Sequence, residues 1–127
     1  MSGNVESLLA ANQAFYDAHE HRDLDAMTAL WSAGDDIVCV HPGWRILRGE
    51  REVLSSWAAI FGGGGHNQFI LTNVEGFVRG EVGVVTCDEN LMDGSAGATI
   101  AATNVFELVD GAWSLLTHHG SPVVPMM

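Results

Sequence analysis

The sequence predicts an α+β fold in a single domain over residues 1–127, in which helices come first and an antiparallel sheet follows. Apolar residues recur at three- and four-residue steps in the first half of the chain, which is typical of amphipathic helices. From residue 69 onward they fall in longer runs separated by turn residues, which is typical of strands. An apolar fraction of 47% in 127 residues is sufficient for one packed core. Helices followed by strands, rather than alternating with them, favour the α+β class.

Three helices are expected, over residues 5–21, 24–31 and 50–61. Asn4 and Asp23 precede the first two and can accept hydrogen bonds from the free N–H groups of the first turn. Gly49 lies just before the third helix, and Gly62 lies just past its end, where a left-handed C-cap favours glycine.

One short strand, Ile37–Val40, is expected between the second and third helices. Its residues are continuously apolar and mostly β-branched, so both of its faces should be covered. Pro42 disfavours helical geometry at His41, which predicts that the strand ends there and that a turn carries the chain through Trp44. An imidazole at a strand end, followed by a tryptophan on a turn, indicates the lip of a small-molecule pocket.

Four long strands are expected, over residues 69–78, 82–91, 98–109 and 112–120. Turns separate them at 79–81, 93–95 and Asp110-Gly111, the last a typical two-residue hairpin signal. The glycine run 62–65 is interpreted as a helix-to-strand linker. It is not a phosphate-binding loop, because no Lys-Ser/Thr follows it and a strand comes next.

The net charge of −11 arises from 16 acidic residues against five arginines, with no lysine. The sequence has neither the basic patch that binds nucleic acid nor the polybasic cluster that binds an anionic membrane. Nucleic acids and membranes are therefore excluded as partners. No positively charged leader and no apolar run of membrane-spanning length are visible, which predicts a cytoplasmic protein. Cys39 and Cys87 lie in apolar strand-like runs and are expected to be buried, reduced thiols rather than a disulfide.

Three segments carry a resemblance to a known family: FYDAHEHRDLDAMTALWS (15–32), DDIVCVHPGWRILRGEREVLSSWAAIF (35–61) and the closing DGAWSLLTHHGS (110–121). Over about residues 5–121 the chain resembles SnoaL-like, ketosteroid-isomerase-related proteins of the nuclear transport factor 2-like (cystatin-like) superfamily. The resemblance implies a curled sheet that encloses a conical cavity closed by helices. It also implies a homodimer formed through the outer face of the sheet.

The same resemblance makes His41 the candidate catalytic residue, because the family's strand-end general base falls on this position. Imidazole can serve as base or acid near neutral pH. The alternative is that the ring binds a backbone carbonyl and fills the lip. The isomerase's tyrosine falls on Phe15, next to Tyr16, and its partner acid falls near Ile100 or Ala101, where no acid exists. Steroid-type isomerisation is therefore excluded, because its electrostatic stabilisation is missing.

The remaining candidates are ligand-binding residues: Tyr16, Trp44, Trp57, Asn104, His118 and His119. Trp44 is singled out because it lies on a turn rather than in a periodic run. Asn104 interrupts an apolar strand, where burial requires a hydrogen-bond partner. It is expected either to orient a ligand or to make a cross-strand bond.

His118 and His119 are adjacent on one strand, so only one of them can face the cavity. Simple alternation places His119 on the face of Trp113 and Leu115, and His118 on the face of Leu116. Which face is inward stays open, and so does a purely structural role for either ring.

Neither a metal nor a cofactor is expected. His41, one of the histidine pair, and Asp88 or Glu89 could in principle meet, but none has the close spacing of a metal motif. Asp88 and Glu89 face opposite ways, so one of them is expected to be solvated. Motifs for nucleophilic catalysis and dinucleotide binding are absent.

Arg45, Arg48 and Arg51 cluster after Trp44 and have two interpretations. They could receive a ligand carboxylate, or they could neutralise neighbouring acids in an acidic chain, namely Asp35, Asp36, Glu50 or Glu52.

Two functional hypotheses follow. In the first, the cone binds a small, largely apolar organic molecule and His41 transfers a proton on a carbonyl compound, in isomerase, cyclase or lyase chemistry. In the second, the cone is filled by its own side chains and the domain serves association. Contacts among the side chains at positions 16, 41, 57 and 104 would favour the second, and a gap of ligand size would favour the first.

Overall fold

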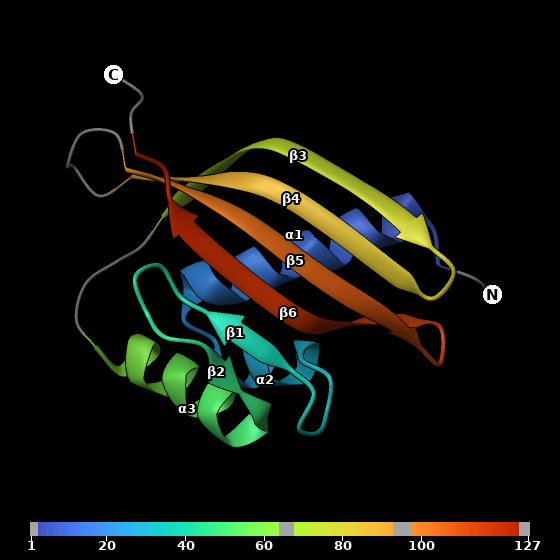
Figure 1. Ribbon diagram of the computed structural model, residues 1–127, viewed down its shortest axis with the longest axis horizontal. Coiled ribbons are helices and arrows are strands. Elements are labelled where there is room, and N and C mark those ends of the chain that lie inside the picture. The colour runs from blue at the N-terminus through green and yellow to red at the C-terminus, as the bar shows by residue number, and fades with distance from the viewer. Residues whose placement is uncertain (1–2, 64–67, 93–97, 125–127) are drawn as a thin grey trace.

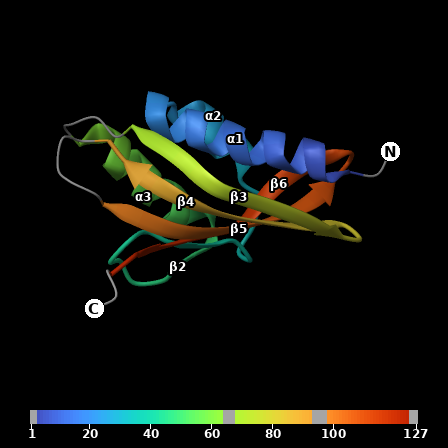
Figure 2. The same cartoon turned by 90° about the horizontal axis from the view of Figure 1, so that it is seen from above.

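Helices cover one face of a curved, six-stranded sheet in the computed structural model, which describes residues 3–63, 68–92 and 98–124 (Figures 1 and 2). The helices are α1 (Val5–His21), α2 (Leu24–Leu30) and α3 (Gly49–Gly62). The strands are β1 (Val38–Val40), β2 (Leu47–Arg48), β3 (Phe69–Arg79), β4 (Val82–Leu91), β5 (Thr99–Val109) and β6 (Ala112–Pro122). None of the described helices is long and apolar enough to cross a membrane.

The predicted caps of the first two helices are present. Asn4 accepts a hydrogen bond from the Ser7 backbone N–H at 2.8 Å in a reciprocal capping box. Asp23 accepts one from the Ala26 N–H at 3.0 Å. The left-handed cap expected at Gly62 is wrong, because Gly62 is the last residue of α3 and the C-cap, Gly63, has a φ of −74°. Residues 64 and 65 of the predicted linker, and the turn expected at 93–95, lie outside the described residues.

The four long strands form the predicted antiparallel meander, in the sheet order β2-β1-β6-β5-β4-β3. The short strand β1 lies beside β6 and runs parallel to it, with Val40 opposite His119. Strand β2 is a two-residue addition that the sequence did not predict, and it pairs antiparallel with β1. This arrangement brings the end of β1 to the mouth of the curved sheet, beside α3 (Figure 1).

The core lies between α1 and the concave face of the sheet. Buried aromatic and aliphatic side chains of α1 and α3 meet those of β4, β5 and β6 there, including Phe15, Trp57, Val85, Phe106 and Leu115. Cys39 and Cys87 are buried free thiols, as predicted.

Candidate functional site

A hollow of about 270 Å³ opens at the mouth of the curved sheet. Apolar side chains from α3, β3, β4 and β5 form much of its wall, and ten residues line it: His19, His41, Pro42, Trp44, Ile60, Phe69, Glu89, Leu91, Ile100 and His118. Four of these are ionisable, and we refer to the hollow as the histidine pocket. It holds roughly nine water molecules' share of liquid volume, so its occupant is small.

His41 is placed by a turn that the sequence encodes. Strand β1 ends at Val40, Gly43 has a φ of +83°, and the Trp44 N–H donates to the His41 carbonyl at 2.8 Å. Proline in the second and glycine in the third position are the residues that a type II turn requires. The His41 ring is thereby held at the pocket wall, between Trp44 and Trp57, with ring centroids 4.8 and 4.7 Å away.

Ser56 on α3 fixes the tautomer of His41. The Ser56 hydroxyl lies 2.6 Å from the Val53 carbonyl oxygen, which can only accept, so the hydroxyl proton belongs to that bond. The same oxygen lies 2.8 Å from His41 Nε2 and must therefore accept from it. Burial, and secondarily the charge of His19, lower the pKa of His41 to about 4, so the ring is neutral at pH 7. Nδ1 is then its proton-accepting nitrogen.

His118 is held in the opposite tautomer by Asn104. The Asn104 side-chain amide donates to Asn12 at 2.8 Å and to Tyr16 Oη at 3.2 Å, which leaves its carbonyl oxygen to accept. His118 Nδ1 donates to that oxygen at 2.6 Å, so Nε2 is the acceptor of this ring. Burial lowers the pKa of His118 to about 3, and His41, the next cause, adds to the effect. Asn104 therefore makes the expected cross-strand bond, and through it orients a pocket histidine.

Glu89 on β4 is the acidic group of the pocket. It is 4% exposed, and Tyr16 Oη donates to its Oε2 at 2.6 Å. Burial raises the pKa of Glu89 to about 7, although the Tyr16 hydrogen bond opposes the rise. Burial, and next the Glu89 charge, raise the pKa of Tyr16 far above its ordinary value, so the phenol stays protonated. Near neutral pH, Glu89 can therefore both give and take a proton.

His19 on α1 is a third neutral imidazole. Its ring is packed edge-on by Trp57 and Phe69, with centroids 4.9 and 4.7 Å away. Burial lowers the pKa of His19 to about 4. Its Nδ1 is buried and has no hydrogen-bond partner among the described residues, so this ring contributes an unsatisfied polar atom to the pocket region.

The seven site residues predicted from the sequence divide into three sets: those that line the pocket, those that are buried, and His119, which is described below. His41, Trp44 and His118 line the pocket. Tyr16, Trp57 and Asn104 are fully buried and do not line it, but each contacts a residue that does: Tyr16 contacts Glu89, Trp57 contacts His41, and Asn104 contacts His118. Tyr16 thus contacts Asn104, and His41 contacts Trp57, while a hollow of about 270 Å³ remains beside His41.

His119 is exposed on the outer face of the sheet, away from the pocket. The expected sharing of a face with Trp113 and Leu115 is wrong, because a bulge lies between them: Val105 pairs with Thr117, but Phe106 pairs with Leu115. The extra residue, Leu116, shifts the alternation by one and turns His118 inward.

Sequence reasoning missed two of the four ionisable residues that line the pocket, Glu89 and His19. Glu89 interrupts an apolar strand, but it was considered only as a metal ligand, and its partner Tyr16 lies 73 positions away. His19 carries no motif signal, and the sequence places it only within the predicted helix 5–21. Asp88 lies on the outer face, so the expectation that the two acids face opposite ways is correct. Among the described residues, no group of three His, Cys, Asp or Glu side chains is arranged to hold a metal ion.

Comparison with known proteins places this chain in a family. The family model "SnoaL-like domain" matches residues 8–126. A proposed dehydratase of the NTF2-like family from Streptomyces avermitilis is 37% identical, with a TM-score of 0.87 over 95% of this chain and 97% of that one. A proposed calcium/calmodulin-dependent protein kinase type II association domain from Thiobacillus denitrificans is 32% identical, with a TM-score of 0.84 over 98% of each chain.

F-box protein SKIP8 of Arabidopsis thaliana is 29% identical over 117 residues, which are 92% of this chain. The chain spans about half the length of this curated relative, since the match covers 50% of it. The extent of the family match and the shared architecture agree, and the chain belongs to the SnoaL-like domain family with its NTF2-like fold.

Proposed function

We propose that this chain binds a small carbonyl compound in the histidine pocket and transfers a proton on it. One observation carries the proposal: two neutral imidazoles with assigned proton-accepting nitrogens and a carboxyl group with a pKa of about 7 line the same largely apolar hollow. Ionisable groups with strongly shifted pKa values in a concave site favour acid–base chemistry.

The reaction that these groups support best is lyase chemistry on a β-hydroxy carbonyl compound. His41 Nδ1 removes the proton α to the carbonyl, and protonated Glu89 gives its proton to the departing hydroxyl. A carbon–carbon double bond and one water molecule form, and the imidazolium then returns its proton to Glu89. The similarity to the Streptomyces protein, itself a proposed dehydratase, supports this assignment.

The first step can be tested without knowing the natural substrate. A methyl ketone such as 2-octanone, incubated in D₂O, should exchange its α-protons faster with the protein than in buffer alone, as followed by ¹H NMR. His41→Gln should return the rate to that of buffer. His119→Gln is the matched control, because this ring lies on the outer face, and it should keep the wild-type rate. Equal rates for His41→Gln and wild type would remove His41 from the chemistry.

A second candidate function is association, because the outer face of the sheet carries a broad hollow of about 850 Å³. Side chains of all four long strands line it, among them Thr86, Thr103, Thr117 and His119. The similarity to the Thiobacillus protein, a proposed association domain, supports the same idea. We propose that a second copy of the chain packs here, in a cytoplasmic homodimer; the two reduced thiols agree with that compartment.

Sedimentation equilibrium tests the association. The wild type should sediment as a dimer, and Thr103→Arg, which introduces a charge at the centre of the outer face, should sediment as a monomer with an unchanged circular dichroism spectrum. A wild-type monomer at high micromolar concentration would contradict this second proposal.

A further inference from the structure

A groove of about 650 Å³ lies beside the histidine pocket, between the 44–48 segment and α3. Nine residues line it: Trp44, Arg45, Leu47, Arg48, Arg51, Glu52, Ser55, Ser56 and Ala59. We refer to it as the arginine groove. Three of the five arginines of a chain with a net charge of −11 lie in it, against a single carboxylate, so it is a local positive site on an acidic molecule.

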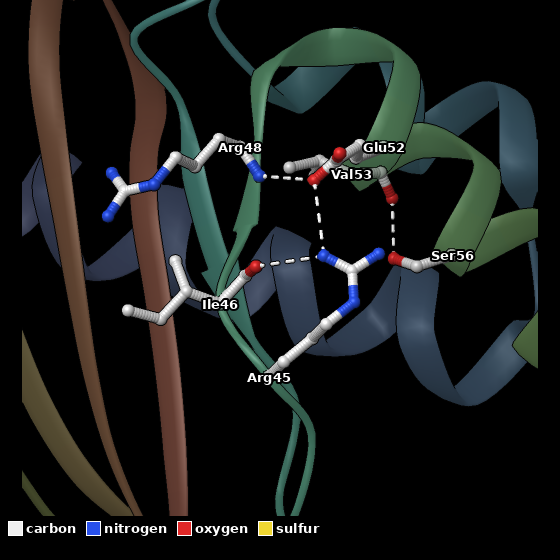
Figure 3. A network of polar contacts seen from close by, with 6 residues as sticks. All are labelled: Arg45, Ile46, Arg48, Glu52, Val53 and Ser56. Atoms are coloured by element: carbon white, nitrogen blue, oxygen red, sulfur yellow. Dashed lines mark hydrogen bonds and ion pairs between the residues drawn. The ribbon is translucent and has the colours of Figure 1, made fainter.

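Neighbouring acids neutralise these arginines only in part. Arg45 Nη1 lies 3.7 Å from Glu52 Oε1 and donates to the Ile46 carbonyl at 3.3 Å (Figure 3). Glu52 also accepts from the Arg48 backbone N–H at 3.0 Å, and that bond, followed by the Arg45 charge, keeps its pKa below the usual range. Arg51 makes no ion pair with any described residue. The expected pairing with Asp35, Asp36 or Glu50 is absent from the described part of the chain.

The side chains of the groove are arranged around Arg45. Its guanidinium extends toward α3, whereas that of Arg48 points away from it (Figure 3). The ion pair and the carbonyl bond both use Nη1, so Nε and Nη2 of Arg45 keep their donors for a ligand. Arg51 and Ser55 add further donors from the same helix. Arginine forks of this kind match the geometry of carboxylate and phosphate oxygens.

The groove and the pocket adjoin at Trp44. Trp44 lines both hollows, and its ring packs against His41. Ser56 lines the groove, and its hydroxyl is the group that fixes the His41 tautomer. One molecule can therefore place an apolar carbonyl end in the pocket and a charged end in the groove.

We propose that the arginine groove is an anion subsite, built on Arg45 and Arg51, that receives the carboxylate or phosphate of the compound whose carbonyl end enters the histidine pocket. This inference rests on the proposed function and defines its substrate class as an anionic carbonyl compound. Glu52 tunes the subsite, since it holds Arg45 in place and competes with the anion for it.

Two matched probes test the inference. 2-Octanone and 7-oxooctanoate differ only in their last carbon, which is a methyl group in one and a carboxylate in the other, and each is titrated into ¹⁵N-labelled protein. The carboxylate should lower the Kd about fivefold, as expected for partly exposed charge-assisted pairs. The gain should shrink as salt is raised. Inorganic phosphate alone should shift the amide signals of residues 45–56, which shows whether a phosphate serves as well as a carboxylate.

Variants separate the subsite from the pocket. Arg45→Gln/Arg51→Gln should lose the advantage of 7-oxooctanoate over 2-octanone, and Glu52→Gln should enlarge it. Arg79→Gln is the control: it removes one arginine that stacks on Phe77, far along β3, and should leave the advantage unchanged. Equal Kd values for the two probes in the wild type, or an advantage that survives Arg45→Gln/Arg51→Gln, overturn the subsite. If 2-octanone binds in such a case, the proposed function of the histidine pocket is retained. If neither ketone binds, both the proposed function and the anion subsite are contradicted.

Discussion

Ser56 is the residue on which the chemical state of His41 depends. Its hydroxyl can only accept from His41 Nε2, because its own proton is bound to the Val53 carbonyl. Ser56→Ala removes this acceptor, so the ring is free to change tautomer and Nδ1 is no longer held as the base. We expect the rate of α-proton exchange to fall roughly tenfold, the equivalent of one lost hydrogen bond of about 1.4 kcal/mol.

The accompanying measurement is the ¹⁵N chemical shift of the His41 ring, which reports the tautomer directly. It should move toward the Nδ1–H form in Ser56→Ala and be restored in Ser56→Thr. Thr28→Ala, which removes an exposed hydroxyl on α2 that lines neither hollow, is the control. A purely structural role for Ser56 would lower stability without moving the ring signals.

Glu89 gives the reaction its alkaline limit. Catalysis needs neutral His41, which has a pKa of about 4, and protonated Glu89, which has a pKa of about 7. The rate of dehydration of a β-hydroxy ketone should therefore be highest between these values and fall above pH 7. Glu89→Gln cannot transfer a proton, so its residual rate should be lower and lack the alkaline limb. An unchanged profile in this variant would exclude Glu89 as the acid.

His41 and Glu89 show how much of a site can be predicted from sequence. His41 could be placed from sequence, because the proline after it ends the strand within one residue. Glu89 could not, since alternation says only that it and Asp88 face opposite ways. Its role depends on Tyr16, which approaches from a helix 73 positions away. Local rules therefore position backbone features well but do not show which distant side chains converge.

At the scale of elements, the four strands and three helices followed from hydrophobic period, caps and turn residues. The parallel pairing of β1 with β6 and the bulge at Leu116 did not. A bulge adds one residue to one strand and reverses the direction in which every residue beyond it faces. The pattern of apolar residues in the sequence does not show where the bulge lies. This single feature decides that His118, and not His119, faces inward.

The contact between α1 and β4 gives a prediction at the same scale. Gly83 lies where Leu8 of α1 meets the sheet, and a Cβ at this position would come within 2.5 Å of the Leu8 side chain. Leu8 is fully buried, so its side chain cannot shift without displacing its neighbours in the core. Gly83→Val should therefore lower the free energy of unfolding by about 1–3 kcal/mol, in the range measured for overpacked cores.

Urea denaturation checks this value, with Gly62→Ala as the comparison. A Cβ at Gly62 meets no atom within 4 Å, and the residue lies in the last turn of α3. This change should be neutral or stabilise by up to about 1 kcal/mol. Equal effects for the two substitutions would mean that α1 does not pack tightly against β4.

For the whole molecule, the buried ionisable groups link stability to pH in a defined direction. Burial lowers the pKa values of His19, His41 and His118 from 6.5 to about 4, 4 and 3, so between pH 4.5 and 6.5 the unfolded chain binds protons that the folded chain does not. Burial raises the pKa of Glu89 from 4.5 to about 7, so in the same range it binds a proton only when folded. On unfolding, the three histidines therefore bind protons and the one carboxyl releases its proton. The chain takes up about two protons in net.

Because the unfolded state binds more protons, the free energy of unfolding should rise with pH across this range, by about 2.7 kcal/mol per unit near pH 5.5. Urea denaturation at pH 5.0, 5.5 and 6.0 measures the slope. Glu89→Gln removes the one opposing group, so its slope should increase to about three protons, or about 4 kcal/mol per unit. A slope near zero, or one that Glu89→Gln makes shallower, would mean that the pocket histidines keep their solution pKa values, and the acid limit expected near pH 4 for the proposed chemistry would move up toward neutral pH.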